Sequence, residues 1–353
     1  MIYRREDFVK ELSYNFGSLK SDQYLTSDID QYERIGQEPT INNAIYEQLL
    51  SINDYLRVEK DTHFKSHKGY PSPRSIYPIK MFISDGTFFY SKNIFNDCYE
   101  IYKNAHLQVM NGDIVLEYGA EYPDFYISIK KTLYLLEMGH LLYNLLAMSE
   151  MLGIQYRVQL VENKMILKQI QNSNTVDGKN ISELLEKCTL RTSGPYLHPI
   201  TSFQFYCAGH NEDDRMALEK LRDALCMNFD IDVITVNKYQ NDGTGSFIKR
   251  KCREQESISY TEMNMLYPFI NFKNLSFFVT FQLANRIFDQ AGNSAIYLIA
   301  LGYLAQLYCL ENARQDVFCR PIKSFNIKDL ERLTQLESND STIMYTLLCG
   351  SIY

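Results

Sequence analysis

Residues Leu133–Gly153 form an apolar run, rich in Leu, Met, Tyr and Ala, that contains no proline. Such residues favour a helix, and a helix that is apolar on all sides is buried in a core or between subunits. A membrane span is the alternative for a run of this length. Glu137, His140 and Asn144 argue against a span, because polar and charged groups near its centre are costly. We therefore expect a helix buried in protein.

A second apolar run, Ile296–Asn312, repeats the pattern of the first. When Gly139 is aligned with Gly302, the line YLLEMGHLLYNLLAMSE falls on YLIALGYLAQLYCLENA, and Tyr134 falls on Tyr297. A repeated pattern of this kind indicates an internal duplication, which has to be considered before any fold is assigned. One pair of helices is weak evidence for it, because buried helices resemble one another in composition.

A second pair of segments supports the duplication. Tyr70–Ser84 reads YPSPRSIYPIKMFIS, and Thr192–Cys207 reads TSGPYLHPITSFQFYC. Each begins as a loop rich in Ser, Pro or Gly and continues with alternating apolar residues, which is typical of a strand. Short helical patterns precede them, at Ile45–Leu56 and Ile181–Leu190. The order helix, loop, strand and long buried helix therefore occurs twice.

These segments resemble two motifs of the nitroreductase superfamily, in its branch of SagB-type azoline dehydrogenases. The loops resemble the P-S-x-G-x-x-Y-P segment of that branch, and the first apolar helix resembles its L-L-E-x-G-H-x-x-x-N-L-L-x-A helix. The second copy of the helix keeps only Gly302 and the apolar frame. The matching residues are Ser72, Tyr77, Pro78, Leu135, Leu136, Glu137, Gly139, His140, Asn144, Leu145, Leu146 and Ala147 in the first copy, and Ser193, Gly194, His198 and Pro199 in the second loop.

The resemblance implies an α+β, nitroreductase-like fold in two tandem copies. Single-copy relatives are homodimers whose long helices pack across a two-fold axis, so this chain would form an internal pseudo-dimer around its two buried helices. The linker-like stretch NSNTVDGK separates a first domain, residues 1–171, from a second and more divergent domain, residues 172–353. The second domain would carry an insert at about residues 209–274.

The resemblance also implies flavin mononucleotide (FMN), bound in clefts between the two copies. Backbone amides of the Ser-Pro loops would contact the flavin ring, and arginines would bind its phosphate, because the guanidinium group is planar and permanently charged. For each residue, an ordinary turn, strand or solvated position is the alternative. The residues expected to bind the cofactor are Arg4, Ser72, Arg74, Ser75, Ser193, Tyr196 and Arg320.

The catalytic residues follow the family less closely. SagB-type dehydrogenases carry a Lys-Tyr pair before the buried helix, and that position falls at Phe125-Tyr126 here, so the lysine is absent. Tyr126 remains, and Lys130 is near enough along the chain to replace the missing lysine. His140 is the third candidate, although a histidine on an apolar helix is more often a core residue. A buried base needs a shifted pKa to act near neutral pH.

Composition argues against several classes of protein. The net charge of −7 gives no general attraction to nucleic acid or to an anionic membrane. The eight cysteines include no C-x-x-C pair, so no metal site is expected. The charged start MIYRREDF does not read as a signal peptide, and scattered cysteines then indicate reduced thiols in the cytoplasm.

Between the repeated segments, local patterns predict further elements. Turn residues mark the ends of strands, and apolar spacing separates helices from strands. The expected elements are a hairpin strand at Thr87–Ser91, helices at Ile94–Asn104 and Ala217–Leu225, a strand at Ile231–Val236 and a loop at Glu59–Lys68.

Two functions from different classes remain. The first, which we favour, is an FMN-dependent oxidoreductase acting on a ribosomal peptide, by resemblance through dehydrogenation of azoline to azole rings. The second is a catalytically degenerate partner or peptide-binding subunit of a peptide-modifying complex. The Ser-Pro loops and Glu137–His140 favour the first, whereas the absent lysine and the divergent second copy favour the second. The expected partners are the peptide substrate and other subunits of such a complex, and homo-oligomerisation stays open.

Overall fold

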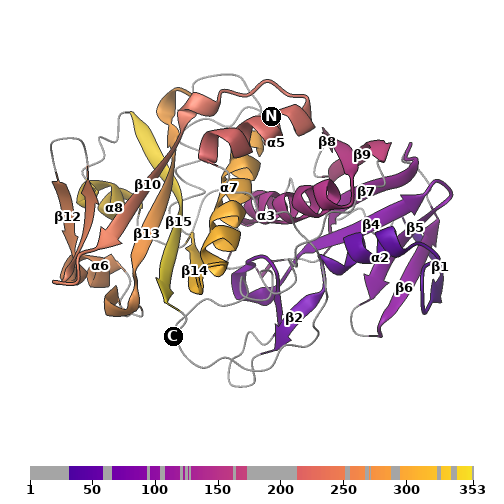
Figure 1. Cartoon of the computed structure of the whole chain (residues 1–353), viewed down its shortest axis with the longest axis horizontal. Coiled ribbons are helices and arrows are strands. Elements are labelled where there is room, and N and C mark those ends of the chain that lie inside the picture. Colours follow the sequence, from indigo (N-terminus) through magenta and orange to yellow (C-terminus); the bar gives the residue numbers. More distant parts are fainter. Residues whose placement is uncertain are drawn as a thin grey trace.

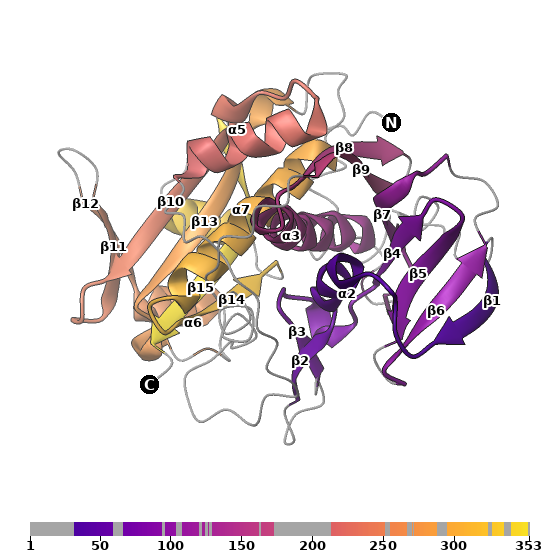
Figure 2. The same cartoon turned by 45° about the vertical axis from the view of Figure 1, so that its right-hand side comes forward.

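The computed structural model places two antiparallel sheets on either side of a central pair of helices (Figure 1, Figure 2). The expected cofactor residues Arg4, Ser193 and Tyr196, and the segments 173–190 and 192–207, lie outside the described residues. The structure describes residues 32–58, 66–93, 96–103, 108–119, 122–123, 126, 129–161, 164–172, 213–250, 255–266, 270, 272–287, 295–323, 327–334 and 340–351.

The first sheet has seven strands in the order β1-β6-β5-β4-β7-β9-β8, and every neighbouring pair is antiparallel. Strand β8 alternates between buried and exposed residues, as a strand with one solvated face does. The strands are β1 (Glu33–Glu38), β4 (Ile79–Asp85), β5 (Phe88–Asn93), β6 (Cys98–Lys103), β7 (Asn111–Tyr118), β8 (Ile154–Val161) and β9 (Lys164–Asn172). A separate hairpin joins β2 (Tyr55–Val58) to β3 (Ser66–Lys68).

The second sheet has six antiparallel strands in the order β12-β11-β10-β13-β15-β14. Its central strands β13 and β15 are buried along almost their whole length, since they are covered on both faces. The strands are β10 (Ile234–Asn241), β11 (Ser246–Arg250), β12 (Gln255–Ser259), β13 (Phe277–Ala284), β14 (Val317–Ile322) and β15 (Ser341–Ser351).

The two sheets share one order of strands. Without β1, the first sheet reads β6-β5-β4-β7-β9-β8, and each of these strands has a counterpart at the same place in the second sheet. A helix precedes each series: α2 (Ala44–Ser51) leads to β4, and α5 (Asp214–Leu225) leads to β10. Asn43 and Asp213 cap the two helices by accepting hydrogen bonds from backbone N–H groups of the first turn.

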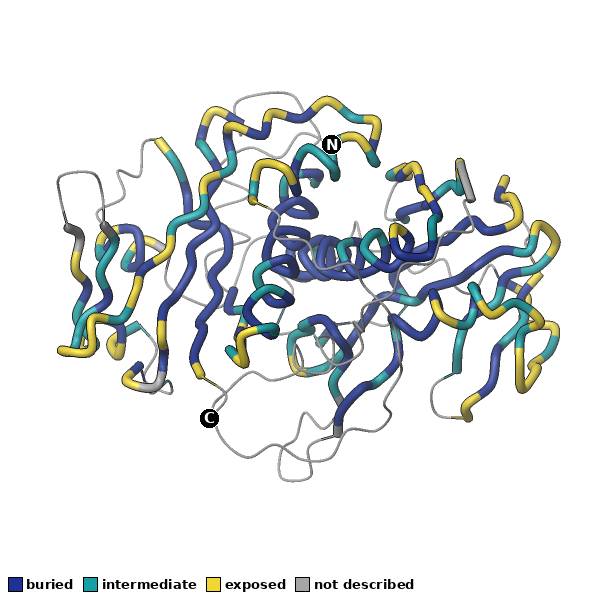
Figure 3. The backbone as a smooth tube through the Cα atoms, viewed as in Figure 1, coloured by how far each residue is buried: buried dark blue, intermediate teal, exposed yellow. Residues whose placement is uncertain are grey.

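The two apolar runs form the central helices α3 (Lys130–Met151) and α7 (Ala295–Ala313). Both are buried on nearly all sides, as their sequences predict, and they lie in contact at the centre of the molecule (Figure 3). No helix among the described residues is both long and apolar enough to cross a membrane.

Gly139 and Gly302 mark the point where the two helices cross. A Cβ atom on Gly139 would lie 2.1 Å from the carbonyl oxygen of Ile299, and one on Gly302 would lie 2.0 Å from that of Leu136. Each glycine therefore faces the residue three positions before the other glycine. Only glycine allows two helix backbones to approach this closely, which explains why the two runs align on these residues.

Two local expectations are corrected by the structure. Residues 94–104 were expected to be helical, but Cys98–Lys103 is the strand β6, paired with β1 and β5. Hydrogen bonding on both sides outweighs the weak helical pattern of this short segment. The helix expected at Ile45–Leu56 ends at Ser51, and Tyr55–Val58 is instead the strand β2. Thr87–Ser91 and Ala217–Leu225 lie largely within β5 and α5, as expected.

The segment expected to be an insert, residues 209–274, is an integral part of the second sheet. From Asp213 onward its described residues form α5, β10, β11, β12 and α6 (Tyr260–Leu266). Three of the six strands of the sheet therefore come from it. The expected strand at Ile231–Val236 is a short 3-10 helix, Ile231–Val233, followed by β10.

The remaining described helices lie around the sheets. They are the 3-10 helices Pro73–Ser75, Phe272–Asn274 and Asn285–Ile287 and the helix α8 (Ile327–Leu333).

Candidate functional site

The Ser-Pro loop before β4 has an unusual backbone. Arg74, Ser75 and Tyr77 all have positive φ angles, of 54°, 56° and 49°. Residues other than glycine rarely adopt this conformation, which costs of the order of 1–3 kcal/mol for each residue. Strained backbone persists only where the surrounding contacts enforce it, and it is concentrated at functional sites.

Hydrogen bonds hold this loop in place. The Ser72 hydroxyl accepts a hydrogen bond from the backbone N–H of Tyr77 at 2.8 Å, and the Ser72 carbonyl accepts one from the Ser75 N–H at 3.1 Å. The Tyr77 hydroxyl in turn accepts a hydrogen bond from the backbone N–H of Lys68 at 2.9 Å. Ser72 and Ser75 are half-buried, whereas Arg74 is exposed at the tip of the loop.

A buried lysine lies behind the loop. The Lys68 ammonium donates a hydrogen bond to Asn53 Oδ1 at 2.7 Å and lies 5.3 and 5.2 Å from the ring centres of Tyr55 and Tyr77. The Tyr70 hydroxyl donates to the same Asn53 oxygen at 2.9 Å. Burial lowers the pKa of Lys68 to about 7, although nearby carboxylates oppose the shift. Lys68 therefore changes its charge near neutral pH.

A buried carboxyl group from helix α3 completes this cluster. Glu137 is 3% exposed, and burial raises its pKa to about 8, against the opposing influence of Ser72, Tyr122 and Lys68. Its Oε1 accepts a hydrogen bond from the Tyr122 hydroxyl at 2.9 Å. Its Oε2 is buried without a well-formed hydrogen bond among the described residues. A carboxyl group in this state is protonated at neutral pH and can donate a hydrogen bond.

His140, one turn further along α3, faces the second half of the chain. Its Nδ1 lies 2.8 Å from Gln306 Oε1 on α7, and its Nε2 lies 3.2 Å from the Tyr345 hydroxyl on β15. The Gln306 amide nitrogen also donates hydrogen bonds to the carbonyl of Gly69 at 2.8 Å and to Asn144 Oδ1 at 2.9 Å. A continuous polar network therefore joins the loop, α3 and the second sheet.

The other expected site residues that the structure describes are Tyr126, Lys130 and Arg320, and each lies in a different part of the fold. Tyr126 is half-buried, and its ring packs edge-on against that of Tyr122 at 5.9 Å, next to Glu137. Lys130 is buried in the first turn of α3. Arg320 is exposed on the edge strand β14, opposite Leu348.

Sequence reasoning missed Lys68, Tyr70, Asn53 and Gln306 as site residues. Lys68 ends the charged segment that was expected to be a loop, and no local pattern shows that the hairpin β2–β3 carries it into the interior. Gln306 stands out in one respect only, since it is a polar residue inside an apolar helix. A buried amide needs hydrogen-bond partners, and its position was therefore a usable signal.

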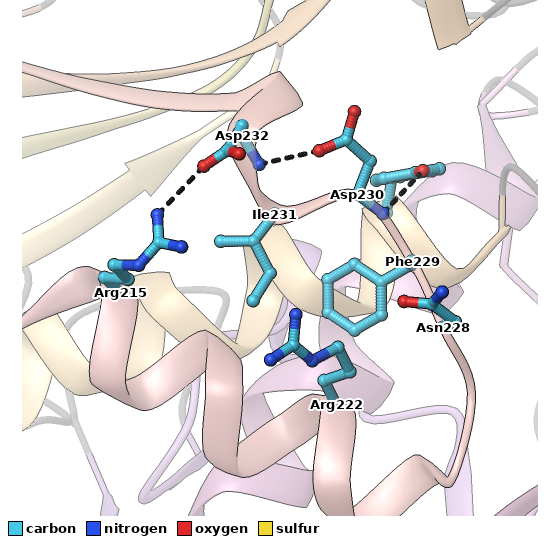
Figure 4. A pocket seen from close by; sticks show the side chains of 8 residues that line it. Arg215, Arg222, Asn228, Phe229, Asp230, Ile231 and Asp232 are labelled. Atoms are coloured by element: carbon cyan, nitrogen blue, oxygen red, sulfur yellow. Dashed lines mark hydrogen bonds and ion pairs between the residues drawn. The ribbon is translucent and has the colours of Figure 1, made fainter.

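A hollow lies in the other half of the chain, between α5 and the start of α7 (Figure 4). Its volume is about 420 Å³, and Arg222, Phe229 and Tyr297 contribute to its walls. Its other charged groups are paired, because Arg215 binds Asp232 at 2.9 Å and Asp230 binds Arg286 at 2.8 Å. This hollow is mostly polar and open, and its charges balance one another, so we place the candidate site at the Ser-Pro loop.

Comparison with known proteins identifies the fold. No family model matches the sequence, and no curated protein matches it. A candidate nitroreductase from Anabaena variabilis superposes with a TM-score of 0.59 at 10% identity, over 100% of both chains. A candidate nitroreductase from Ralstonia eutropha has a TM-score of 0.31 at 11% identity, over 52% of this chain and 88% of its own. The first match, which covers the whole chain, shows that this protein has a nitroreductase-like fold.

Proposed function

We propose that the chain is an FMN-dependent oxidoreductase with its cofactor cleft at the Ser-Pro loop of the first half. The observation that carries this proposal is the pair of buried ionisable groups behind the loop, Lys68 and Glu137. Both have pKa values displaced toward neutrality by burial, to about 7 and about 8. Groups with such values concentrate at catalytic sites, because they can give or take a proton under working conditions.

The described residues fit the chemistry of FMN. Glu137 Oε2 is a buried oxygen without a well-formed hydrogen bond, and at neutral pH it belongs to a protonated carboxyl that can donate to an acceptor atom. Ser72 and Ser75 border the loop with small side chains, and the exposed Arg74 offers a permanent positive charge for a phosphate. When bound, the flavin supplies the hydride chemistry, and the protein supplies orientation and proton transfer.

The proposed roles follow from these positions. Glu137 holds a proton at its carboxyl group, and Tyr122 orients that group through Oε1. The Lys68 ammonium, fixed by Asn53, stabilises negative charge on Glu137 after the proton leaves. Of the residues expected from the sequence, Tyr126 lies against Tyr122 and would exclude water from this side of the cluster.

We also propose that the two halves are tandem copies that form an internal pseudo-dimer. The order of strands that the two sheets share once β1 is left out, and the reciprocal contact of Gly139 and Gly302, support this arrangement. Homodimers place one copy of each element on either side of a two-fold axis. In this chain, the covalent connection would replace that axis with an approximate one, and the second half would close the cleft of the first.

The finer proposal is that the substrate is a ribosomal peptide, whose azoline ring loses two hydrogens to become an azole. This step rests on the resemblance of the loop and the α3 helix to SagB-type dehydrogenases. The competing function is a non-catalytic partner subunit. It is favoured by the missing lysine before Tyr126.

Purified protein tests the cofactor directly. We expect it to carry FMN and to absorb near about 450 nm, as oxidised flavins do. Protein that stays colourless after incubation with excess FMN would support the partner-subunit function instead.

Replacing Arg74 with Ala should weaken FMN binding by roughly tenfold to a hundredfold, because it removes a charge-assisted hydrogen bond worth about 1.5–3 kcal/mol. Flavin per chain after gel filtration measures the effect. Tyr196→Ala, in the segment that the sequence alone aligned with this loop, should matter less. Loss of flavin from Tyr196→Ala alone would place the working cleft in the other half.

A further inference from the structure

The crossing of α3 and α7 has two sides that differ in chemistry. Tyr143 on α3 and Gln306 on α7 are equivalent, because each follows the crossing glycine of its helix by four residues. His140 and Tyr303 are equivalent in the same way, because each directly follows its glycine. On one side, the rings of Tyr143 and Tyr303 pack at 4.8 Å. On the other side, the equivalent pair is His140 and Gln306, joined at 2.8 Å. The polar pair lies on the side of the Ser-Pro loop.

Gln306 is fully buried and uses both ends of its amide. Its nitrogen donates hydrogen bonds to Gly69 O at 2.8 Å and to Asn144 Oδ1 at 2.9 Å. Its oxygen therefore has to accept, and the partner at 2.8 Å is His140 Nδ1. This assignment places the proton of a neutral His140 on Nδ1, so Nε2 accepts the hydrogen bond from the Tyr345 hydroxyl at 3.2 Å.

The contact with Gly69 reaches the candidate site. Gly69 lies between Lys68, which carries the buried ammonium group, and Tyr70, which shares Asn53 with it. The strained part of the loop begins at Arg74, five residues after Gly69. A strained backbone requires neighbouring contacts that keep it from relaxing. Gln306 is such a contact, and it belongs to the second half of the chain.

We propose that Gln306 is a positioning residue, through which the second half holds the loop of the first half in the conformation that binds the cofactor. Tyr345 and His140 fix the orientation of the Gln306 amide, and this amide fixes the start of the loop through Gly69. The proposal rests on the proposed FMN site. It assigns to the second half a specific task in that site, beyond packing against α3.

The test compares substitutions at equivalent positions on the two sides of the crossing. Gln306→Met removes the contact with Gly69 and keeps the length of the side chain. Tyr143→Met is the control, because it breaks the ring pair on the other side and leaves Gly69 in place. A second variant, Gln306→Glu, keeps the shape and the acceptor toward His140. In the wild type Asn144 Nδ2 also donates to the Gly69 carbonyl, at 3.4 Å. When Asn144 reverses its amide to face the new carboxyl, this weaker donor turns away as well, so Gly69 loses both side-chain donors.

Two readouts separate positioning from general stability. The first is the dissociation constant of FMN, which should rise about tenfold or more in both Gln306 variants, at temperatures well below their unfolding. The second is tryptic cleavage after the exposed Arg74 in protein stripped of flavin, which should become faster. Tyr143→Met should leave both close to wild type, although its unfolding temperature falls.

The outcomes distinguish this inference from the proposed function. Wild-type protein that binds no FMN would overturn the proposed FMN site. Faster cleavage in the Gln306 variants would then still support the role of Gln306 in positioning the loop. Wild-type protein that binds FMN, with unchanged affinity and cleavage in both Gln306 variants, would overturn the role of Gln306. Equal losses in Tyr143→Met would also overturn it, since the effect would then belong to the helix interface in general.

Discussion

Lys68 and Glu137 lie in one buried cluster, and burial shifts their pKa values in opposite directions. Burial lowers the pKa of Lys68 from its ordinary value of 10.5 to about 7 and raises that of Glu137 from 4.5 to about 8. The folded protein therefore binds a proton on Glu137 that the unfolded chain loses above about pH 4.5. Between about pH 4.5 and pH 8, Glu137 therefore lowers the free energy of unfolding as the pH rises. Above about pH 7, the unfolded chain keeps a proton on Lys68 that the folded protein loses, so Lys68 raises the free energy of unfolding as the pH rises. The effects of Lys68 and Glu137 therefore oppose each other between pH 7 and 8.

Replacing Glu137 with Gln should remove this loss of stability. Relative to wild type, the variant should become more stable as the pH rises from 5 to 7, by up to about 1.4 kcal/mol per pH unit for one linked proton. Urea unfolding at pH 5, 6 and 7 measures the difference. Glu38→Gln, which changes an exposed carboxyl on β1, should show no comparable trend. Parallel stability curves for wild type and Glu137→Gln would show that Glu137 is ionised in the folded protein.

The Tyr77 hydroxyl is expected to stabilise the base of the loop. Tyr77→Phe keeps the ring beside the Lys68 ammonium but leaves the backbone N–H of Lys68 buried without its acceptor, which costs about 1–3 kcal/mol. Tyr297→Phe is a matched control, because its hydroxyl accepts a backbone N–H from Asp230 at an exposed place where water can replace it. Urea unfolding of both variants should show a loss for Tyr77→Phe and almost none for the control.

The sequence pointed to part of this site and not to the rest. Ser72, Glu137 and His140 lie in segments whose spacing resembles known motifs, so the loop and one face of α3 were expected. Lys68 and Gln306 become site residues only through contacts with residues distant in sequence, such as Asn53 and Gly69. Local patterns carry no information on these contacts.

Among the elements, the crossing of α3 and α7 depends most on single residues. Gly139→Ala or Gly302→Ala would place a Cβ atom about 2 Å from a backbone carbonyl oxygen, which cannot move without shifting a whole helix. The intrinsic preference of a helix for Ala over Gly, about 1 kcal/mol, works in the other direction. Overpacking in a buried core costs about 1–3 kcal/mol or more, so we expect a net loss.

Thermal unfolding of the two glycine variants measures this loss. Gly36→Ala is a suitable control, since a Cβ atom there would meet nothing within 4 Å. An unfolding temperature that stays at the wild-type value in both Gly139→Ala and Gly302→Ala would show that the helices do not cross as closely as the structure indicates.

The sequence predicted the long apolar helices correctly, but it did not predict some of the short segments in which polar and apolar residues are mixed. The runs that form α3 and α7 have a pattern that only burial explains, and both are helices as expected. The segment Cys98–Lys103 has too few residues to distinguish a helix from a strand by periodicity, and its two neighbouring strands decide the outcome. The same applies to the segment once expected to be an insert, whose strands are defined by their pairing with β13.

At the scale of the whole molecule, the two halves share a strand order but differ at the place where the candidate site lies. In the first half, residues 52–78 connect α2 to β4 and include the hairpin β2–β3 and the Ser-Pro loop. In the second half, only residues 226–233 connect α5 to β10, and they form a turn and a short 3-10 helix. The cluster around Lys68 and Tyr70 therefore has no counterpart at the equivalent place.

This asymmetry predicts one FMN per chain. In the proposed arrangement the second half closes the cleft of the first within one covalent chain, so binding should not require a second chain and the FMN dissociation constant should not change with protein concentration. Homodimers that share a cleft between subunits lose their site when the subunits separate. The measurement is the ratio of flavin absorbance to protein, together with the FMN dissociation constant over a hundredfold range of protein concentration. A ratio near two would require a second cleft in the other half. Affinity that weakens on dilution would mean that a second chain completes the site.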